Sequence, residues 1–460
     1  MARRAIAAIS CALAGAFLTA SGRGGAQPAT VVTAPSTSVS VDESTPPPPG
    51  KPSKTVAGWK GLWAELPKGS ADLRIALAEI ERAEAATRIA YGAVLPTITA
   101  SASWNYSSRP QFVAGAVASG GILQAQLTAS QVLVNLRAFH QIGTQKMLEE
   151  VTHLDVFEVR RRLGLGLARA AAAIAAAERL TEGNRTSLSL SLDRLLLTKK
   201  RLAAGVGDAR DLVRAQQDVA TARSVIAPAD EGLLQAEEGL ATLIGTPGSI
   251  GLGVDLEGLD REIRDFCGEA ASTDKDRLDV TIAKKRIELA ERNVDDITLK
   301  FVPTLTAQAS AGMAGIAFSG PFTSVETITV VLSVPLFDGG VRYGEKRDRV
   351  ALVEEARARA VQVQITSMVE RAQARRALDV ALAAQKSAKE ARDLAAEADR
   401  LAQAAYAGGV GTNFDLIDAG RRLRESETQL VLRDLDVAKA RLALPFVEGT
   451  CAGIAKKAGS

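Results

Sequence analysis

The sequence consists of two copies of one unit, and this repeat constrains the fold more than any other feature. Three blocks occur twice in the same order, and the two occurrences of each block lie 203 to 207 positions apart. The pairs are VLPTITASASWNY with FVPTLTAQASAGM, QVLVN at 131–135 with VPLFD at 334–338, and AAGVGDARDL with GGVGTNFDL. Self-similarity at one period indicates a structural repeat. We therefore predict one unit at 70–245 and a second at 277–448. An equatorial linker at 246–276 is predicted to join them, and a C-terminal tail follows at 449–460.

Each unit contains two stretches in which polar and apolar residues alternate. These stretches are 97–106, 122–134, 304–313 and 325–337. A period of two is typical of a strand with one apolar and one hydrated face. We therefore predict one β-hairpin in each unit, at 94–135 and 302–338. Their loops are expected around 107–120 and 314–323.

The predicted strands have the length needed to cross an outer membrane. About ten residues suffice for a tilted strand whose apolar face meets lipid and whose polar face meets water. Trp104 and Tyr106 lie at a strand end, where an interfacial belt of aromatic residues would fall. A half-exposed sheet of a soluble protein would alternate in the same way. Four strands cannot close a barrel in lipid, because open edges are not tolerated there, so a membrane barrel would have to be shared between chains.

The rest of each unit has the composition of long helices. Aromatic residues make up only 4% of the chain, while alanine-rich runs such as ARAAAAIAAAERL are frequent. The predicted helices are 70–92, 137–203, 209–245, 278–300, 339–407 and 413–444. Each unit would then form two antiparallel rods of similar length, about 100 Å, that reverse at a Gly-Val-Gly turn. Small alanine side chains allow such rods to pack closely. A solvated coiled coil is the alternative interpretation of the helices alone.

The N-terminus has the pattern of a secretory signal peptide at 1–26. Two arginines precede an apolar run that is shorter than the roughly 20 residues of a bilayer-spanning helix, which is the competing interpretation. Cys11, preceded by Ala-Ile-Ser, is a weaker candidate for a lipoprotein attachment site. Residues 27–69 are rich in Pro, Ser, Thr and Gly, and are predicted to be a linker or a disordered arm.

Composition argues against nucleic-acid binding and against an enzyme. The formal net charge is only +3, with acids and bases mixed throughout. His140 and His153 lie 13 residues apart on one predicted helix without a cysteine nearby, so neither a metal site nor a histidine-based catalytic site is expected. No phosphate loop of the G-x-x-x-x-G-K type occurs. We predict no cofactor. Cys267 and Cys451 each follow a predicted helix; an oxidising compartment would let them pair, and the sequence leaves this open.

With strands, helices and turns in this order, the sequence resembles the TolC-like outer-membrane efflux protein family over nearly all of the chain after residue 70. The resemblance rests on LPT and VPT at the strand openings, SVPLFDGG after the second hairpin, and YAGGVGTNFDLIDA at 406–419. The first unit departs from the family at Val132 and Leu136, where the second has Pro335 and Gly339.

The resemblance implies a mainly α-helical homotrimer with a membrane β-barrel. Twelve strands would form the barrel in outer-membrane lipid, and the helices would form a periplasmic tunnel. It further implies an exit duct of a tripartite efflux or type I secretion system, docked to an RND or ABC inner-membrane pump through a periplasmic adaptor (membrane fusion) protein. A soluble periplasmic coiled-coil adaptor or scaffold is the alternative, although adaptors lack paired amphipathic hairpins at this period.

The two Gly-Val-Gly turns are the candidate functional region. Their glycines permit a tight reversal between helices, and Asp208 and Asn413 are predicted to cap the helices that follow. The valines at the tips are candidates for contact with the adaptor. The predicted tip residues are Gly205, Val206, Gly207, Gly409, Val410 and Gly411.

Asp415 and Asp418 are three residues apart, which places them on one face of the predicted helix. A trimer would repeat that face around its axis, and such crowding raises the pKa of each carboxylate and attracts cations. By resemblance, these two residues correspond to the constriction aspartates of a gate that is closed at rest. The resemblance also implies a closed-state latch between Tyr406 and Asp211. Gly411 occupies the place of the family's latch arginine, for which Arg210 is the candidate substitute.

Overall fold

The computed structural model describes residues 40–113, 116–268, 277–316 and 322–451. The chain divides into two units, 1–41 and 42–460, and the helices and strands of the described residues all lie in the second. The predicted signal peptide at 1–26, with Cys11, lies outside the described residues. So does most of the predicted C-terminal tail.

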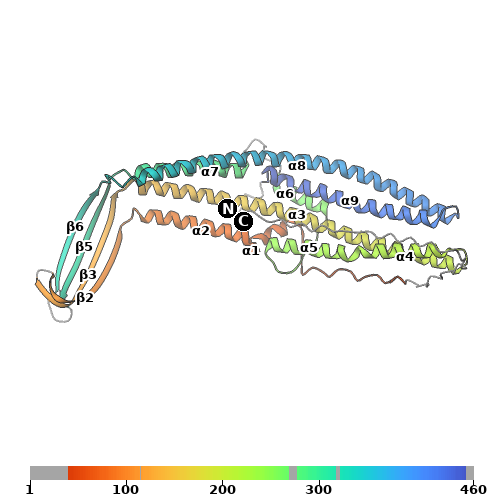
Figure 1. Ribbon diagram of the computed structural model, residues 1–460, viewed down its shortest axis with the longest axis horizontal. Coiled ribbons are helices and arrows are strands. Elements are labelled where there is room, and N and C mark those ends of the chain that lie inside the picture. The colour runs from red at the N-terminus through yellow and green to blue at the C-terminus, as the bar shows by residue number, and fades with distance from the viewer. Residues whose placement is uncertain (1–39, 114–115, 269–276, 317–321, 452–460) are drawn as a thin grey trace, which may run out of the picture. The chain divides into compact units, whose positions relative to one another are not determined.

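The two predicted repeats are present, and in each a β-hairpin is followed by long helices (Figure 1). The first repeat consists of α2 (Ala71–Gly92), β2 (Thr97–Val113), β3 (Ala116–Val134), α3 (Leu136–Ala203), α4 (Ala209–Ser224) and α5 (Ile226–Ile244). The second consists of α7 (Leu278–Leu299), β5 (Thr304–Ile316), β6 (Phe322–Ser333), α8 (Val341–Ala407) and α9 (Asn413–Glu448). The mainly helical fold with two tandem hairpins is therefore confirmed.

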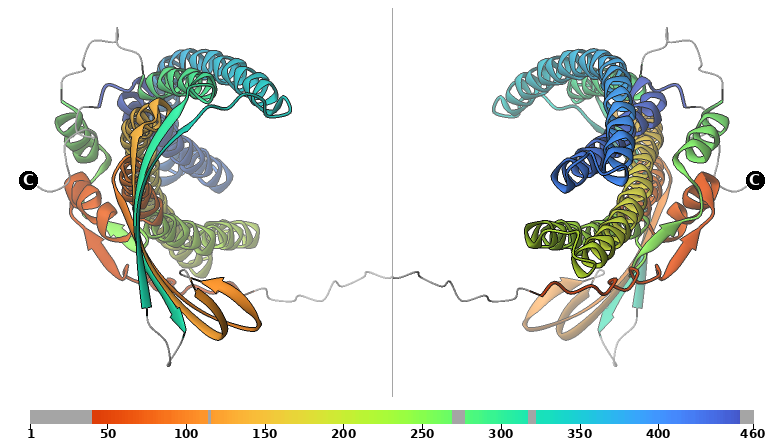
Figure 2. Two further views of the ribbon diagram at one scale, coloured as in Figure 1. Left: turned by 90° about the vertical axis from the view of Figure 1, so that its left-hand side faces the viewer. Right: turned by 90° about the vertical axis from the view of Figure 1, so that its right-hand side faces the viewer.

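The two hairpins form one four-stranded antiparallel sheet in the order β2-β3-β5-β6. The strands β3 and β5, which come from different repeats, pair with each other, so β2 and β6 are the edges. Seen end-on in Figure 2, the sheet and the long helices follow curved layers rather than a closed bundle. Among the described residues, neither edge of the sheet has a partner strand.

The register of the sheet separates its apolar residues from its polar ones. One cross-strand row consists of Ile98, Ala129, Ala309 and Ile328, and the next consists of Thr99, Thr128, Ser310 and Thr327. Directly paired residues share a face, so the first row belongs to an apolar face and the second to a polar face. Large apolar side chains of the first face are exposed in the single chain, among them Ile98, Trp104, Leu127, Ile328, Val330 and Leu332.

The strands are longer than the alternating pattern predicts. β2 continues to Val113 and β3 begins at Ala116, so the loop predicted at 107–120 is wrong for most of its length. The register shifts between Ser107 and Gln111, where a bulge interrupts the pairing. β2 has two more residues than β3 between these pairs, so Ser108, Arg109 and Pro110 lie outside the regular pairing, and the alternating pattern breaks off there. The loop predicted at 314–323 is also shorter than expected, because β5 continues to Ile316.

The helix predicted at 209–245 is two helices. α4 ends at Ser224 and α5 begins at Ile226. Pro228 lies in the first turn of α5; its ring would collide with the carbonyl of Ser224 in a continuous helix. The equivalent α9 has its only proline, Pro445, near its end and is continuous over 36 residues.

An equatorial core lies beside the middle of α3, and it corrects the prediction for residues 54–69. Residues 54–69, predicted as part of a linker or disordered arm, form β1 (Lys54–Val56) and α1 (Gly58–Gly69). The predicted linker contains β4 (Ile250–Leu252), which pairs with β1 in parallel, and α6 (Leu256–Cys267). The proline-rich stretch before residue 54 concealed a short amphipathic helix whose apolar positions are spaced as a helix requires.

Aromatic residues that are distant in sequence meet in this core. The Trp59 ring lies 5.8 Å from the rings of both Phe266 and Phe446, and the Trp63 ring lies 4.9 Å from that of Phe266. Trp59 and Phe446 are fully buried. The cluster therefore joins α1, α6 and the end of α9, which come from three separate parts of the chain.

The described part of the N-terminal arm before β1 is also bound. Arg223 of α4 pairs with Asp42 at 2.5 Å and donates to the carbonyl oxygen of Ser44. Arg185 of α3 donates to the carbonyl oxygens of Pro46 and Pro47 at 3.0 Å each. From residue 42 onwards the arm therefore lies along the helices of the first repeat.

Cys267 at the end of α6 and Cys451 beyond α9 form a disulfide across 184 positions. Their replacement by serine is expected to lower the free energy of unfolding by about 2–4 kcal/mol, because the open chain gains conformational freedom when unfolded. Denaturant unfolding of the detergent-solubilised protein measures this loss. The native protein under reducing conditions should unfold like the Cys267→Ser/Cys451→Ser variant. Equal stability of the oxidised protein and the variant would contradict the expectation.

Candidate functional site

The candidate site consists of the two helix turns, α3 to α4 and α8 to α9, which have the same backbone geometry. Gly205 and Gly409 have φ values of 73° and 77°, a region that favours glycine. The amide of Val206 donates to the Arg201 carbonyl oxygen at 3.1 Å, and that of Val410 donates to the Ala405 carbonyl oxygen at 3.0 Å. These bonds close the last turn of each long helix.

The second glycine of each turn is required because there is no room for a Cβ atom, and not because of its φ angle. A Cβ atom at Gly207 would lie 2.8 Å from the backbone nitrogen of Leu202, and one at Gly411 would lie 2.9 Å from that of Tyr406. Between the glycines, Val206 and Val410 are 77% and 87% exposed. The turns thus present two apolar tips to solvent, in the places predicted for adaptor contact.

The helices after the turns have different caps. The carboxylate of Asp208 accepts a 2.9 Å hydrogen bond from the Arg210 amide, so this predicted cap is confirmed. The predicted cap of α9, Asn413, is wrong: it is the first helical residue and is buried. Thr412 caps this helix instead, since its hydroxyl accepts from the Asp415 amide at 3.1 Å while the Asp415 carboxylate accepts from the Thr412 amide at 3.2 Å. This reciprocal capping box satisfies two amides at once.

The two predicted gate carboxylates are therefore in different environments. Asp415 is exposed, and one of its oxygens also accepts a 2.6 Å bond from the Thr412 hydroxyl. Asp418 pairs with Arg421 at 2.7 Å and with Arg422 at 2.8 Å. The hydrogen bond from Arg421 lowers the pKa of Asp418, opposite to the rise that crowding with like charges was expected to cause. Within one chain, Asp418 is thus a paired carboxylate rather than a free one.

The predicted Tyr406–Asp211 bond does not form in the described structure. The ring of Tyr406 lies 4.1 Å from the Arg201 guanidinium, a cation–π contact between α8 and α3. The Asp211 carboxylate pairs with Arg214 at 3.6 Å. Arg210 pairs with the neighbouring cap residue Asp208 at 2.6 Å and leaves its side chain 83% exposed, so it does not join the two turns.

Two buried ion pairs, absent from the sequence predictions, join the repeats just inside the turns. Arg194 of α3 pairs with Asp399 of α8 at 3.1 Å, and Asp218 of α4 pairs with Arg424 of α9. Asp399 and Asp218 are only 5% and 7% exposed. Gly420 of α9 makes room for the first pair, because a Cβ there would collide with the Arg194 guanidinium. We call these two pairs the buried ties.

The buried ties lie beside a groove of about 910 Å³ between α3, α8 and α9. The partners in each tie are 205 and 206 positions apart, close to the repeat spacing, so nearly equivalent positions of the two repeats face each other with opposite charges. Opposite charges at nearly equivalent positions of the two repeats were the sequence signal from which the buried ties could have been predicted. Gly420, a glycine inside a helix rather than at a turn, was a second one.

The order of elements, the shared sheet and the paired turns define an outer-membrane channel of the efflux class. The sequence matches the family described as Outer membrane efflux protein at residues 64–246 and 272–450. The chain belongs to this family, whose members are channels rather than enzymes; it is an outer-membrane protein with helices that extend into the periplasm. No helix among the described residues is both long and apolar enough to span a bilayer.

Solved structures show the same fold. The outer membrane protein VceC from Vibrio cholerae is 20% identical with a TM-score of 0.69, and the match covers 85% of this chain and 96% of that one. A membrane protein from Pseudomonas aeruginosa is 22% identical with a TM-score of 0.71, covering 85% and 93%. The open state of the Neisseria gonorrhoeae MtrE channel is 20% identical with a TM-score of 0.69, covering 84% and 88%. No match was found among curated protein sequences.

Proposed function

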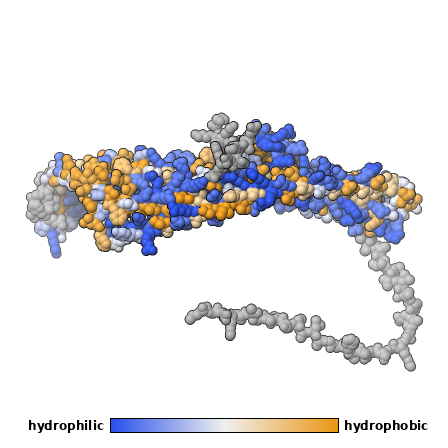
Figure 3. Space-filling view, turned by 90° about the horizontal axis from the view of Figure 1, so that it is seen from above, coloured by the Kyte–Doolittle hydropathy of each residue, from blue (hydrophilic) through white to orange (hydrophobic). Residues whose placement is uncertain are grey.

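We propose that this protein is the trimeric exit duct of a tripartite efflux or type I secretion system. The observation that carries the proposal is the four-stranded sheet, whose apolar face is exposed and whose edges β2 and β6 have no partner strand in the described part of the chain. Hydrophobic residues gather over the sheet end of the surface in Figure 3. Unpaired edges are intolerable in lipid, so β2 of one copy would pair with β6 of the next until three copies close a ring.

The helices would then continue the barrel into the periplasm. Three curved layers of the kind seen in Figure 2 would enclose a tunnel that ends at the helix turns. The exposed valines, Val206 and Val410, would contact a periplasmic adaptor there, and the adaptor would connect the duct to an RND or ABC pump of the inner membrane. The apolar chemistry of both tips supports a protein partner rather than an ionic one.

Cell fractionation and detergent extraction test the proposal. The protein should sediment with outer membranes and elute as a trimer after extraction, and the trimer should conduct ions in planar bilayers. A soluble periplasmic monomer would instead favour the coiled-coil adaptor or scaffold. The exposed apolar face of the sheet argues against that alternative, since it would aggregate in water.

We further propose that the duct is narrowest at the turns and that Asp415 and Asp418 bind cations there. Asp415 supplies the more accessible charge, while Arg421 and Arg422 screen Asp418. Asp415→Ala with Asp418→Ala is expected to remove the block of conductance by divalent or trivalent cations. Arg421→Ala with Arg422→Ala should strengthen the block about tenfold, equivalent to roughly 1.4 kcal/mol, because it frees one carboxylate per chain.

Single-channel recordings with Mg²⁺ and a trivalent lanthanide measure both effects. Glu397→Ala, which removes an exposed carboxylate from α8, is the control and should leave the block unchanged. An unchanged block in the double aspartate variant would remove these residues from the gate. An unchanged block in the double arginine variant would show that Asp418 is not screened as its contacts indicate.

A further inference from the structure

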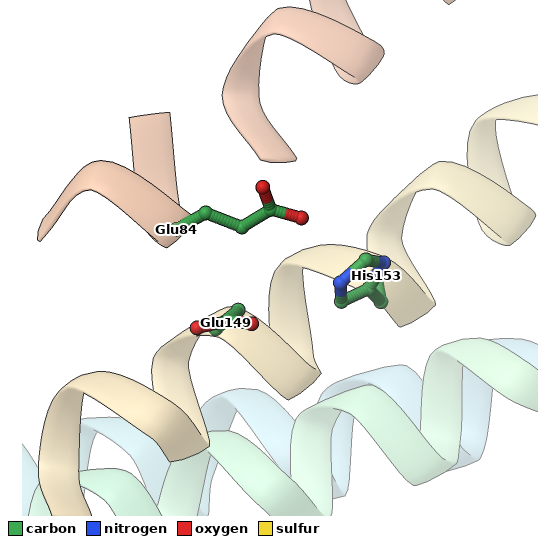
Figure 4. A group of neighbouring side chains, drawn as sticks. All are labelled: Glu84, Glu149 and His153. Atoms are coloured by element: carbon green, nitrogen blue, oxygen red, sulfur yellow. The ribbon is translucent and has the colours of Figure 1, made fainter. Parts of the chain in front are cut away.

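Three side chains of metal-ligating type converge at the partly exposed boundary between α2 and α3, far along the chain from the turns. Figure 4 shows Glu84 reaching from α2 towards Glu149 and His153 on α3. One ligand atom from each residue lies within 4.8 Å of the other two. We propose that Glu84, Glu149 and His153 bind one divalent transition-metal ion of the zinc class. The site goes beyond the exit-duct function and does not depend on it.

The chemistry of the three donors selects the class of ion. One imidazole nitrogen and two carboxylate oxygens suit Zn²⁺, Ni²⁺ or Cu²⁺, whereas Ca²⁺ and Mg²⁺ take oxygen ligands. The two carboxylates balance the charge of a divalent ion. Tetrahedral bonds of about 2.0–2.2 Å would draw the ligand atoms together by roughly 1 Å. The exposed side chains of Glu84 and His153 have the rotational freedom to make this adjustment. A water molecule would complete the fourth position.

The backbone places the ligands without strain. Glu149 and His153 are four residues apart on α3, so they lie on one face, one turn from each other. Glu84 comes from the facing helix. The ion would therefore join α2 to α3 close to the hairpin, and α2 leads directly into the edge strand β2.

Thr87 is the positioning residue of the site. It lies one turn after Glu84 on α2, and its hydroxyl donates a 2.7 Å hydrogen bond to Oε2 of Glu149. This bond fixes the carboxylate and leaves Oε1 for the ion, as the outer-shell partners of metal ligands do. Lys146 lies over the Tyr91 ring at 5.3 Å from its centroid and also interacts electrostatically with Glu149, a charge that the ion would have to compete with.

Sequence spacing alone argued against a metal site, because His140 and His153 are too far apart to share an ion on one helix. In the structure, the candidate ligands grouped with His153 are the two glutamates, Glu84 and Glu149, and not His140. Both glutamates are ordinary members of charged helix surfaces in the sequence. Only the packing of α2 on α3 brings one of them to His153 from the other helix.

Zn²⁺ titration of the detergent-solubilised full chain tests the proposal. The protein is prepared without a histidine tag, treated with a chelator, and titrated with Zn²⁺ in a calorimeter. We expect one ion per chain at micromolar affinity. His153→Ala and Glu84→Gln should each weaken binding at least tenfold. Thr87→Val should weaken it by about tenfold, and Thr87→Ser should restore it.

Two matched variants serve as controls. Glu81→Gln removes an exposed carboxylate of α2 outside the cluster, and His140→Gln removes the other histidine. Both should bind like the native protein. Co²⁺ should give the visible absorption of a four-coordinate site that includes nitrogen, and this band should be missing in His153→Ala. Native affinity in His153→Ala or Glu84→Gln, or equal loss in the two controls, would overturn the proposal.

Discussion

Breaking the tie between Arg194 and Asp399 is expected to open the duct. Asp399 is almost completely buried against α3, and Arg194→Ala leaves this buried charge without its cationic partner, with only the Gln403 amide still donating to it. Such a change costs about 3–5 kcal/mol. The cost destabilises the closed channel, in which this tie joins α3 to α8. A loss of about 3 kcal/mol would shift the ratio of open to closed channels by roughly a hundredfold. Bilayer recordings of the purified channel measure this shift as a higher open probability.

The neighbouring residues provide a control on the same helix. Arg400 pairs with Glu397 at 2.6 Å, but both side chains are more than half exposed, and a surface pair contributes at most about 1 kcal/mol. Arg400→Ala should therefore leave conductance near the native level. The double variant Arg194→Ala/Asp399→Ala should lose less stability than Arg194→Ala alone, since no unpaired charge remains. Native open probability in Arg194→Ala would show that the buried ties do not hold the closed state.

Trp59→Ala is expected to be the most destabilising single change in the equatorial core. The indole is fully buried and contacts Trp63, Phe266 and Phe446, so its removal leaves a large cavity between α1, α6 and α9. The expected loss is about 3–5 kcal/mol in the free energy of unfolding. For a chain of 460 residues, the thermal midpoint should fall by roughly 3–5 °C. Circular dichroism at 222 nm follows the melting of the helices directly.

Trp104→Ala is the matched control, because it makes the same chemical change in an exposed residue of β2. It should leave the melting of the helices near that of the native protein. If Trp59→Ala melts at the native temperature, residues 54–69 do not contribute to the core. That result would favour the linker or disordered arm predicted from the sequence.

The repeat and the two periods of the pattern were sufficient to predict the main elements. Alternation identified the hairpins, and the Gly-Val-Gly blocks marked both helix turns, because these features depend on neighbouring residues alone. The prediction failed where a local signal was interrupted or diluted. A bulge after Ser107 ended the alternation, Pro228 divided a helix, and the prolines before residue 54 hid the amphipathic face that contains Trp59.

The site was predictable in position but not in its contacts. Asp415 was recognised as a carboxylate at the turn, yet its role in a capping box with Thr412 depends on which residue starts the helix. The arginines that pair with Asp418 follow within one turn and could have been weighed as partners at that spacing. The buried ties could not be found from one repeat alone, since their partners lie about 205 positions apart and meet only when α3 packs against α8 and α4 against α9.

The trimeric ring is tested most directly by cysteine cross-linking between the two sheet edges. Each variant carries two new cysteines on the polar face of the sheet. One replaces Ser101 or Ser103 in β2, and the other replaces Thr327 or Thr329 in β6. Cys267 and Cys451 are already joined to each other. If β2 of one copy pairs with β6 of the next, at least one combination should give a covalent ladder in outer membranes that ends at the trimer. Cross-links that stop at a dimer, continue beyond three chains, or fail to form in every combination would contradict a closed ring of three copies.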